Sequence, residues 1–165
     1  MENSLKTTRF KTRDSINKAK LRKRNIRKWS LDADGKTFTW SNRLERVQVI
    51  REGIPYGSLE ILSKKINSPV KVVLNIIGVP QTTYNKKKSS HSLLDSRDSE
   101  LVLRISELID FGIDVFNNEE EKFQRWLNKP NLSLRGVPPI KFFDTISGIN
   151  EVTFCLNRIE YGNFA

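Results

Sequence analysis

The sequence predicts an all-α fold, with a helix-turn-helix bundle followed by a smaller helical domain and a short β-hairpin near residues 29–40. Two observations predict it. Apolar residues recur at helical spacing through most of the chain after residue 41, and cap residues, glycines or prolines bound each run. The length of 165 residues suits one domain or two small ones.

The hairpin is predicted from a turn sequence between two short strands. Asp34-Gly35 is typical of a two-residue hairpin turn. Such a turn pairs Leu31 with Phe38 and Trp29 with Trp40 on one side of the hairpin. Because an isolated hairpin is marginally stable, it needs a helix beneath it.

Three short helices are predicted between residues 41 and 78. The first begins at a capping box made by Asn42 and Glu45, the second begins near Gly57-Ser58, and the third opens with Ser68 as cap and ends at Gly78. Their expected apolar stripes are Leu44, Val47 and Ile50, then Leu59, Leu62 and Ile66, and then Val70, Val73, Leu74 and Ile77.

The C-terminal half is predicted to hold a long helix and several shorter ones. A periodic stretch from Asp95 to Phe116 is the expected dimer element, because of its length and apolar stripe. A second helix follows the acids at 119–121, which complement its positive end. After a turn-rich connection over 130–139 and a short helix from Pro138-Pro139, Gly148 opens the last helix.

The composition excludes most enzyme classes. The chain has one histidine, His91, and one cysteine, Cys155, so a Cys/His or Ser/His/Asp site and a Cys-rich metal site lack their residues. We therefore expect no catalytic residues, no metal, no cofactor and no small-molecule substrate. No apolar run reaches the ~18 residues of a membrane span, and no signal peptide is recognised, so the cytoplasm is expected.

Positive charge is concentrated at the N-terminus. The net charge is +10, and residues 1–30 hold eleven of the 29 Lys and Arg residues against two acids. Such a segment is typical of a disordered arm that contacts phosphates and makes binding salt-dependent. A solubilising extension or a localisation-like basic run are the alternatives.

Residues 73–88 have the layout of a helix-turn-helix. Gly78 permits a tight turn, Val79 wedges the two helices together, and Tyr84 faces inward. In a second possible helix-turn-helix, residues 58–66 and 69–77 would form the two helices, but the second of these is too apolar to enter a DNA groove. The remaining alternative is a packed helical hairpin whose lysines are solvated and bind no DNA. The predicted DNA-binding residues are Gln81, Thr82, Thr83, Asn85, Lys86, Lys87 and Lys88.

Residues 116–162 carry a more specific pattern. It consists of Phe116, Trp126-Leu127, Pro130-Asn131, Leu134, Gly136, Pro139, Thr145, Gly148, Val152, Leu156 and the closing run Arg158-Ile159-Glu160-Tyr161-Gly162. This pattern resembles the C-terminal toxin-binding domain of the Xre/MbcA/ParS antitoxins. Together with the helix-turn-helix, the resemblance covers roughly residues 41–165, and the basic extension before it lies outside the family pattern.

The resemblance implies an antitoxin of a type II toxin–antitoxin system. Its N-terminal part would be a Cro/Xre-like helix-turn-helix bundle that binds operator DNA as a homodimer and represses its own operon. Its C-terminal part would bind a RES-family toxin, an enzyme that depletes NAD⁺, and obstruct its active site. The residues that the resemblance assigns to toxin binding are Arg158, Ile159, Glu160, Tyr161 and Gly162, whereas Trp126, Leu127, Leu134 and Leu156 are expected in the core.

The expected domain organisation follows from these segments. It comprises the basic extension with its hairpin (1–40), the helix-turn-helix domain (41–94), a connecting or dimerisation helix (95–117) and the toxin-binding domain (118–165). A DNA-binding regulator without a toxin partner is the alternative function. An enzyme is the third and weakest hypothesis, because no nucleophile and base can be paired.

Overall fold

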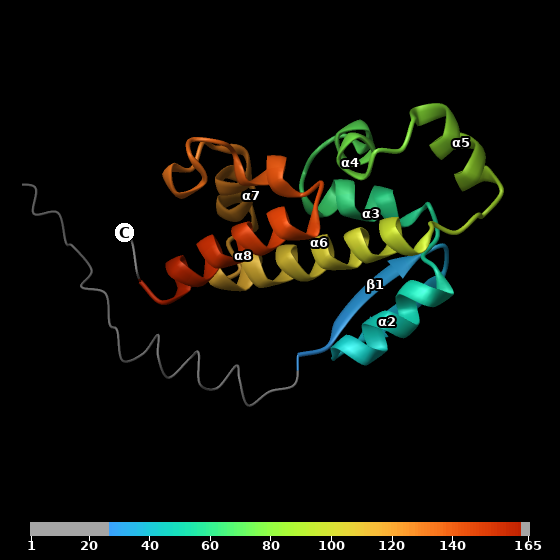
Figure 1. The fold of residues 1–165 in the computed structure, drawn as a ribbon, viewed down its shortest axis with the longest axis horizontal. Helices are drawn as coiled ribbons and strands as arrows, with labels where there is room; N and C mark the ends of the chain where they lie inside the picture. Colours follow the sequence, from blue (N-terminus) through green and yellow to red (C-terminus); the bar gives the residue numbers. More distant parts are fainter. Residues whose placement is uncertain (1–26, 163–165) are drawn as a thin grey trace, which may run out of the picture.

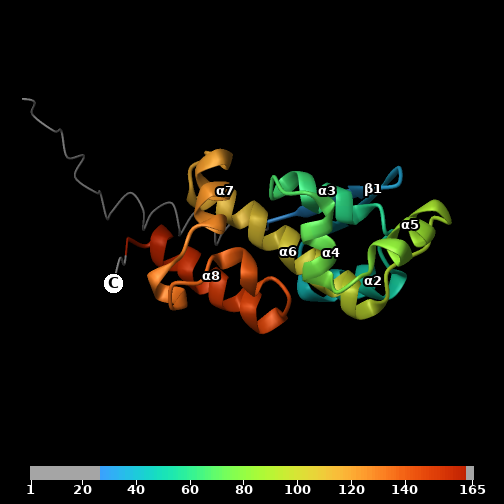
Figure 2. The same cartoon turned by 90° about the horizontal axis from the view of Figure 1, so that it is seen from above.

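Seven α-helices and one two-stranded antiparallel hairpin make up residues 27–162, the part of the chain that the computed structural model describes. The predicted mostly helical fold is confirmed. Helix α6 (Ser96–Val115) runs through the middle of the molecule. The hairpin and helices α2 to α5 surround one end of α6, and α7 and α8 lie at its other end (Figures 1 and 2).

The hairpin has the predicted pairing. Strands β1 (Trp29–Ala33) and β2 (Lys36–Trp40) place Trp29 opposite Trp40. Asp34 and Gly35 both have positive φ, as a type I′ turn requires. The inward side chains are buried against α2, α3 and α6, so the hairpin belongs to the same core as the helices; they are Leu31, Ala33, Phe38 and Trp40.

Helix α2 (Arg43–Glu52) begins at the predicted cap but buries a different face. Asn42 Oδ1 accepts the Glu45 amide at 3.0 Å, and the Glu45 carboxylate accepts the amide and hydroxyl of Ser41. These bonds from Ser41 lower the pKa of Glu45. The predicted stripe was wrong at two of its three positions, because Leu44 is 78% exposed and Val47 is also exposed, whereas Ile50 packs against the core as predicted. The hairpin and α6 pack against the side of α2 that carries Val49 and Arg46 instead.

The next three helices match their predicted bounds closely. They are α3 (Ser58–Lys65), α4 (Val70–Ile77) and α5 (Gln81–Ser89). Their apolar stripes are buried as expected, through Leu59, Leu62, Ile66, Val73, Leu74 and Ile77. The predicted Ser68 cap was wrong: Pro69 occupies the capping position, and the Ser68 hydroxyl bonds the carbonyl of Ile66 instead.

The C-terminal elements complete the fold. Helix α7 (Glu120–Asn128) is followed by two short 3₁₀ helices, η1 (Leu132–Leu134) and η2 (Pro139–Phe142), and by α8 (Ile146–Glu160). Helix α8 begins two residues before the predicted Gly148, because Thr145 Oγ1 caps the helix by accepting the Gly148 amide at 3.0 Å. Gly148 is needed for another reason: a Cβ there would lie 2.2 Å from the Phe142 carbonyl oxygen.

One continuous apolar core joins all of these elements. Four residues were expected in the C-terminal core. Leu127, Leu134 and Leu156 are buried, and Trp126 is partly buried. The apolar stripe of α6 that suggested a dimer element is buried within the chain. Among the described helices, none is long and apolar enough to cross a bilayer.

Candidate functional site

The turn between α4 and α5 has the geometry that the sequence predicts. Gly78 adopts a left-handed conformation, with φ 83° and ψ 26°, where a residue with a side chain would be strained. The amides of Gly78 and Val79 both donate to the Leu74 carbonyl, at 2.8 and 2.9 Å. Val79 and Tyr84 are buried beneath the turn. The tight turn at Gly78 and the inward positions of Val79 and Tyr84 are therefore confirmed.

The outer face of α5 is polar and basic. Five of the seven predicted DNA-binding residues are exposed and two, Thr83 and Lys88, are half-buried; the exposed ones are Gln81, Thr82, Asn85, Lys86 and Lys87. Gln81 Nε2 donates to Asn85 Oδ1 at 3.0 Å, so these two amides are held together. The helix contains no acidic residue. This face can donate many hydrogen bonds, and it carries no negative charge that would repel an anion such as a phosphate.

Lys88 differs from its two lysine neighbours. Its Nζ forms an ion pair with the Glu60 carboxylate from α3 and lies 5.9 Å from the centre of the Tyr84 ring. The hydrogen bond from Lys88 lowers the pKa of Glu60, and the same bond raises the pKa of Lys88. Lys88 thus ties α5 to α3, whereas Lys86 and Lys87 extend into solvent.

The predicted toxin-binding segment forms the end of α8. Arg158 and Tyr161 are exposed, and Ile159 and Glu160 are half-buried. Gly162 follows with positive φ. The segment therefore has an outer side and a side that turns toward the core. Residues 163–165, which follow it, lie outside the described part of the chain.

One exposed aromatic residue was missed by the sequence analysis. Phe154 is 61% exposed and lies one turn before Arg158 on the same side of α8. The signal that points to it is its spacing, since Phe154, Arg158 and Tyr161 are four and three residues apart. The apolar character of Phe154 suggests a core position, but the structure places Val152, Cys155 and Leu156 in the core instead.

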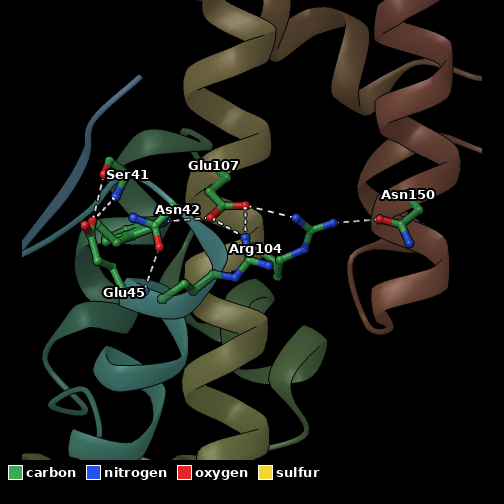
Figure 3. Close-up of polar contacts among 8 residues, drawn as sticks. Ser41, Asn42, Glu45, Arg104, Glu107 and Asn150 are labelled. Carbon is green, nitrogen blue, oxygen red and sulfur yellow. Dashed lines mark hydrogen bonds and ion pairs between the residues drawn. The ribbon is translucent and has the colours of Figure 1, made fainter. Parts of the chain in front are cut away.

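A buried carboxylate connects the two ends of the molecule. Glu107 of α6 accepts hydrogen bonds from Trp40 Nε1 at 2.7 Å, from Arg46 Nη1 at 2.8 Å and from Arg104 Nη1 at 3.0 Å. Arg104 also donates to Asn150 Oδ1 of α8 at 2.7 Å (Figure 3). The guanidinium groups of Arg46 and Arg104 occupy the oxygens of this carboxylate. The arrangement therefore holds the hairpin, α2 and α8 against α6 and is structural rather than catalytic.

The described residues hold no cluster suited to a metal ion, and a half-open cavity lies beside the buried carboxylate. No group of three or more His, Cys, Asp and Glu side chains that could hold a metal ion occurs within residues 27–162. A half-open cavity of about 250 Å³ lies between the hairpin, α6 and α8. It is lined by Trp29, Phe111 and Ile149, and also by Arg104 and Glu107, which are already bonded to each other.

Comparisons with known proteins all point to antitoxins. Residues 112–162 match the family model described as the antitoxin Xre/MbcA/ParS C-terminal toxin-binding domain. An antitoxin Xre of Photorhabdus laumondii is 25% identical over 114 residues, 69% of this chain and 77% of the relative. A Sphingobium protein named Prs ADP-ribosylating antitoxin is 28% identical over 130 residues, 74% and 82% of the two chains. An antitoxin Xre of Yersinia enterocolitica is 22% identical over 119 residues, 72% and 80%.

The matched segment corresponds to one end of the molecule. It begins inside α6 and ends at Gly162, so it contains α7, α8 and the whole of the predicted segment 158–162. The helices α4 and α5 lie outside the matched segment and at the opposite end of α6 from the C-terminal end of α8 (Figures 1 and 2).

Proposed function

Since this chain is an antitoxin of the Xre/MbcA/ParS family, with a toxin-binding domain at its C-terminus, we propose that it neutralises a RES-family toxin that depletes NAD⁺. The antitoxin family is a non-enzymatic class, so the prediction that the chain is no enzyme is confirmed. The observation that carries the proposal is the exposed end of α8, which lies inside the matched toxin-binding segment.

The end of α8 supplies the contact with the toxin. Arg158 and Glu160 provide charged anchors, and Tyr161 is the kind of aromatic residue that dominates binding energy at protein interfaces. Ile159 and Gly162 shape the same segment. In this proposal the segment 158–162 covers the entrance of the toxin's active site and so obstructs it.

The second half of the proposal is autorepression of the operon. Helix α5 enters the major groove of operator DNA, and its first turn, Gln81 to Thr83, faces base edges. Asn85 contacts a base, and the lysines 86–88 contact phosphates, with Lys88 contributing less than its two neighbours because it is paired with Glu60. The exposed, acid-free outer face of α5 supports this assignment. The basic residues within 1–30 add contacts to phosphates that carry no sequence preference.

The proposed assembly is a homodimer that acts in the cytoplasm. Helix-turn-helix proteins bind two half-sites about one helical turn apart, so a two-fold protein matches a two-fold operator. Because the apolar stripe of α6 is buried within the chain, it does not supply the contact between the two copies.

Growth and cellular NAD⁺ test the proposal. The neighbouring reading frame is induced with the full-length chain, with a chain truncated before residue 158, or alone. We expect toxicity and NAD⁺ loss without the chain, rescue by the full-length chain, and no rescue by the truncated one. Circular dichroism shows whether the truncated chain folds. A harmless neighbour, or rescue by a folded truncated chain, contradicts the proposal and favours a DNA-binding regulator without a toxin.

A further inference from the structure

We propose that the outward face of α8, centred on Phe154, is the main anchor for the toxin, so that the interface begins well before the segment 158–162. This inference rests on the proposed function and adds the residue that contributes most of the affinity. Phe154 lies within the segment that matches the toxin-binding domain but outside the residues assigned to toxin binding above.

The outward face of α8 is a single stripe with Phe154 at its middle. Residues 147, 151, 154, 158 and 161 follow one another at spacings of four, three, four and three, which keeps them on one side of a helix. All five are exposed, whereas Ile149, Val152 and Leu156 on the opposite side are buried. The packing of the buried side of α8 therefore holds Phe154 on the side that faces solvent.

The composition of this stripe is that of a protein interface. An aromatic centre with a polar rim is the usual anatomy of a binding hot spot, because the rim excludes water from the centre. Here Glu151 and Arg158 flank Phe154 with opposite charges. Tyr161 adds a second aromatic side chain about 10 Å further along the helix. A single exposed apolar residue is ordinary on any surface, so the assignment depends on the position of Phe154 between Glu151, Arg158 and Tyr161 inside the matched toxin-binding segment.

The toxin is the occupant that fits best. The stripe is continuous with the exposed end of α8 and lies wholly inside the matched toxin-binding segment. Its mixed charges do not suit a polyanion, in contrast to the acid-free outer face of α5. The complementary surface on the toxin is therefore an apolar recess that accepts the Phe154 ring, with an acidic group beside it for Arg158 and a basic group for Glu151.

A competition experiment tests this assignment. The full-length chain, fluorescently labelled, is purified in complex with the product of the neighbouring reading frame and displaced by unlabelled variants. Phe154→Ala is expected to compete at least about 30-fold less effectively than the unmodified chain. The matched control is Leu132→Ala, which removes a 96% exposed apolar side chain from η1 in the same domain and is expected to stay within about threefold.

The folding of the variant is measured in parallel. Because the Phe154 side chain projects into solvent, its thermal midpoint is expected to stay within about 2 °C of the unmodified chain. A larger fall would show that Phe154 supports the fold and would overturn the proposal. Equal competition by Phe154→Ala and the unmodified chain would overturn it as well.

Two further outcomes separate this inference from the proposed function. If the unmodified chain forms no complex with the neighbouring product, the proposed function fails and this inference fails with it. If Phe154→Ala binds the toxin normally but loses self-association in sedimentation experiments, the stripe contacts a second copy of the chain. That result overturns the assignment to the toxin and leaves the proposed function intact.

Discussion

Helices α5 and α8 present different outer faces, although each also has an inward side, which buries Tyr84 in α5 and an apolar stripe in α8. The outer face of α5 carries amides, hydroxyls and lysines, with no acid and no exposed aromatic residue. The outer face of α8 carries Phe154 and Tyr161 with charges of both signs. The first composition suits a polyanion and the second suits a protein surface. The comparison supports the proposal that two partners, DNA and a toxin, bind at the two ends of one small molecule.

The two helices depend on one shared scaffold. Helix α6 packs against α2, α3, α4, α7 and α8, and the Glu107 carboxylate joins the hairpin, α2 and, through Arg104, α8. Substitutions on the scaffold should therefore damage both ends, whereas substitutions on the outer faces should damage one end alone. The following predictions test that distinction, from the largest expected effect to the smallest.

Removing the Glu107 carboxylate should have the largest effect on both ends. Glu107→Ala leaves Arg46 and Arg104, whose side chains are only 17% and 23% exposed, without their partner. We expect a loss of about 3 kcal/mol in the free energy of unfolding, measured in urea, and a joint weakening of DNA and toxin binding. The control Glu52→Ala breaks the exposed pair with Lys36 and should cost less than about 0.5 kcal/mol. Similar costs for the two variants would contradict the scaffold role of Glu107.

A methyl group at position 148 should disturb the C-terminal end first. The new Cβ of Gly148→Ala would meet the carbonyl oxygen of Phe142, which belongs to the backbone and cannot rotate away. We expect a loss of about 2 kcal/mol in urea unfolding and weaker toxin binding, with DNA binding retained. Ser133→Ala changes an exposed residue of η1, which lies in the same domain but outside the outward face of α8, and serves as the control. Unchanged stability in Gly148→Ala would show that η2 moves freely against α8.

The three lysines of α5 should differ in their effect on DNA binding. Lys86→Ala and Lys87→Ala should each reduce the slope of log affinity against log salt by about 0.9, the amount expected for one lost phosphate contact. Lys88→Ala should change that slope less, because Lys88 is paired with Glu60. The slopes are measured by fluorescence anisotropy with DNA from upstream of the chain's own reading frame. Equal slopes for all three variants would show that Lys88 leaves Glu60 when DNA binds.

The smallest effect is expected at Asp98, which touches neither outer face. Burial and the nearby Asp95 raise the pKa of Asp98. The folded chain therefore binds a proton more readily than the unfolded chain, and Asp98 lowers stability as pH rises from about 4 through its raised pKa. Asp98→Asn should raise the thermal midpoint by on the order of 2 °C at pH 7 and have no such benefit near pH 4. An equal change at both pH values would assign the effect to packing.

Local signals in the sequence predict much of the fold. Asp34-Gly35 fixes the register of the hairpin because only a tight turn brings Trp29 and Trp40 together. Gly78 marks the turn between α4 and α5 because it alone there adopts positive φ without strain. In both cases the decisive interactions join residues that are close in the sequence, so their spacing carries the information.

Other features depend on packing between distant segments. The face that α2 buries is decided by the hairpin and by Glu107, which lies 61 residues from its partner Arg46, so the pattern of Leu44 and Val47 misleads. The exposure of Phe154 depends likewise on which side of α8 meets α6 and η2. Spacing shows which residues share a face of a helix but does not show which face is covered.

Measuring both affinities of two variants tests the central claim, that the two ends bind their partners separately. The variants are Thr83→Ala with Lys86→Ala on α5, and Phe154→Ala with Tyr161→Ala on the outward face of α8. The account predicts a crossed result: the first variant loses DNA binding and keeps toxin binding, and the second does the reverse. Equal loss of both affinities in both variants, with unchanged circular dichroism, would contradict it.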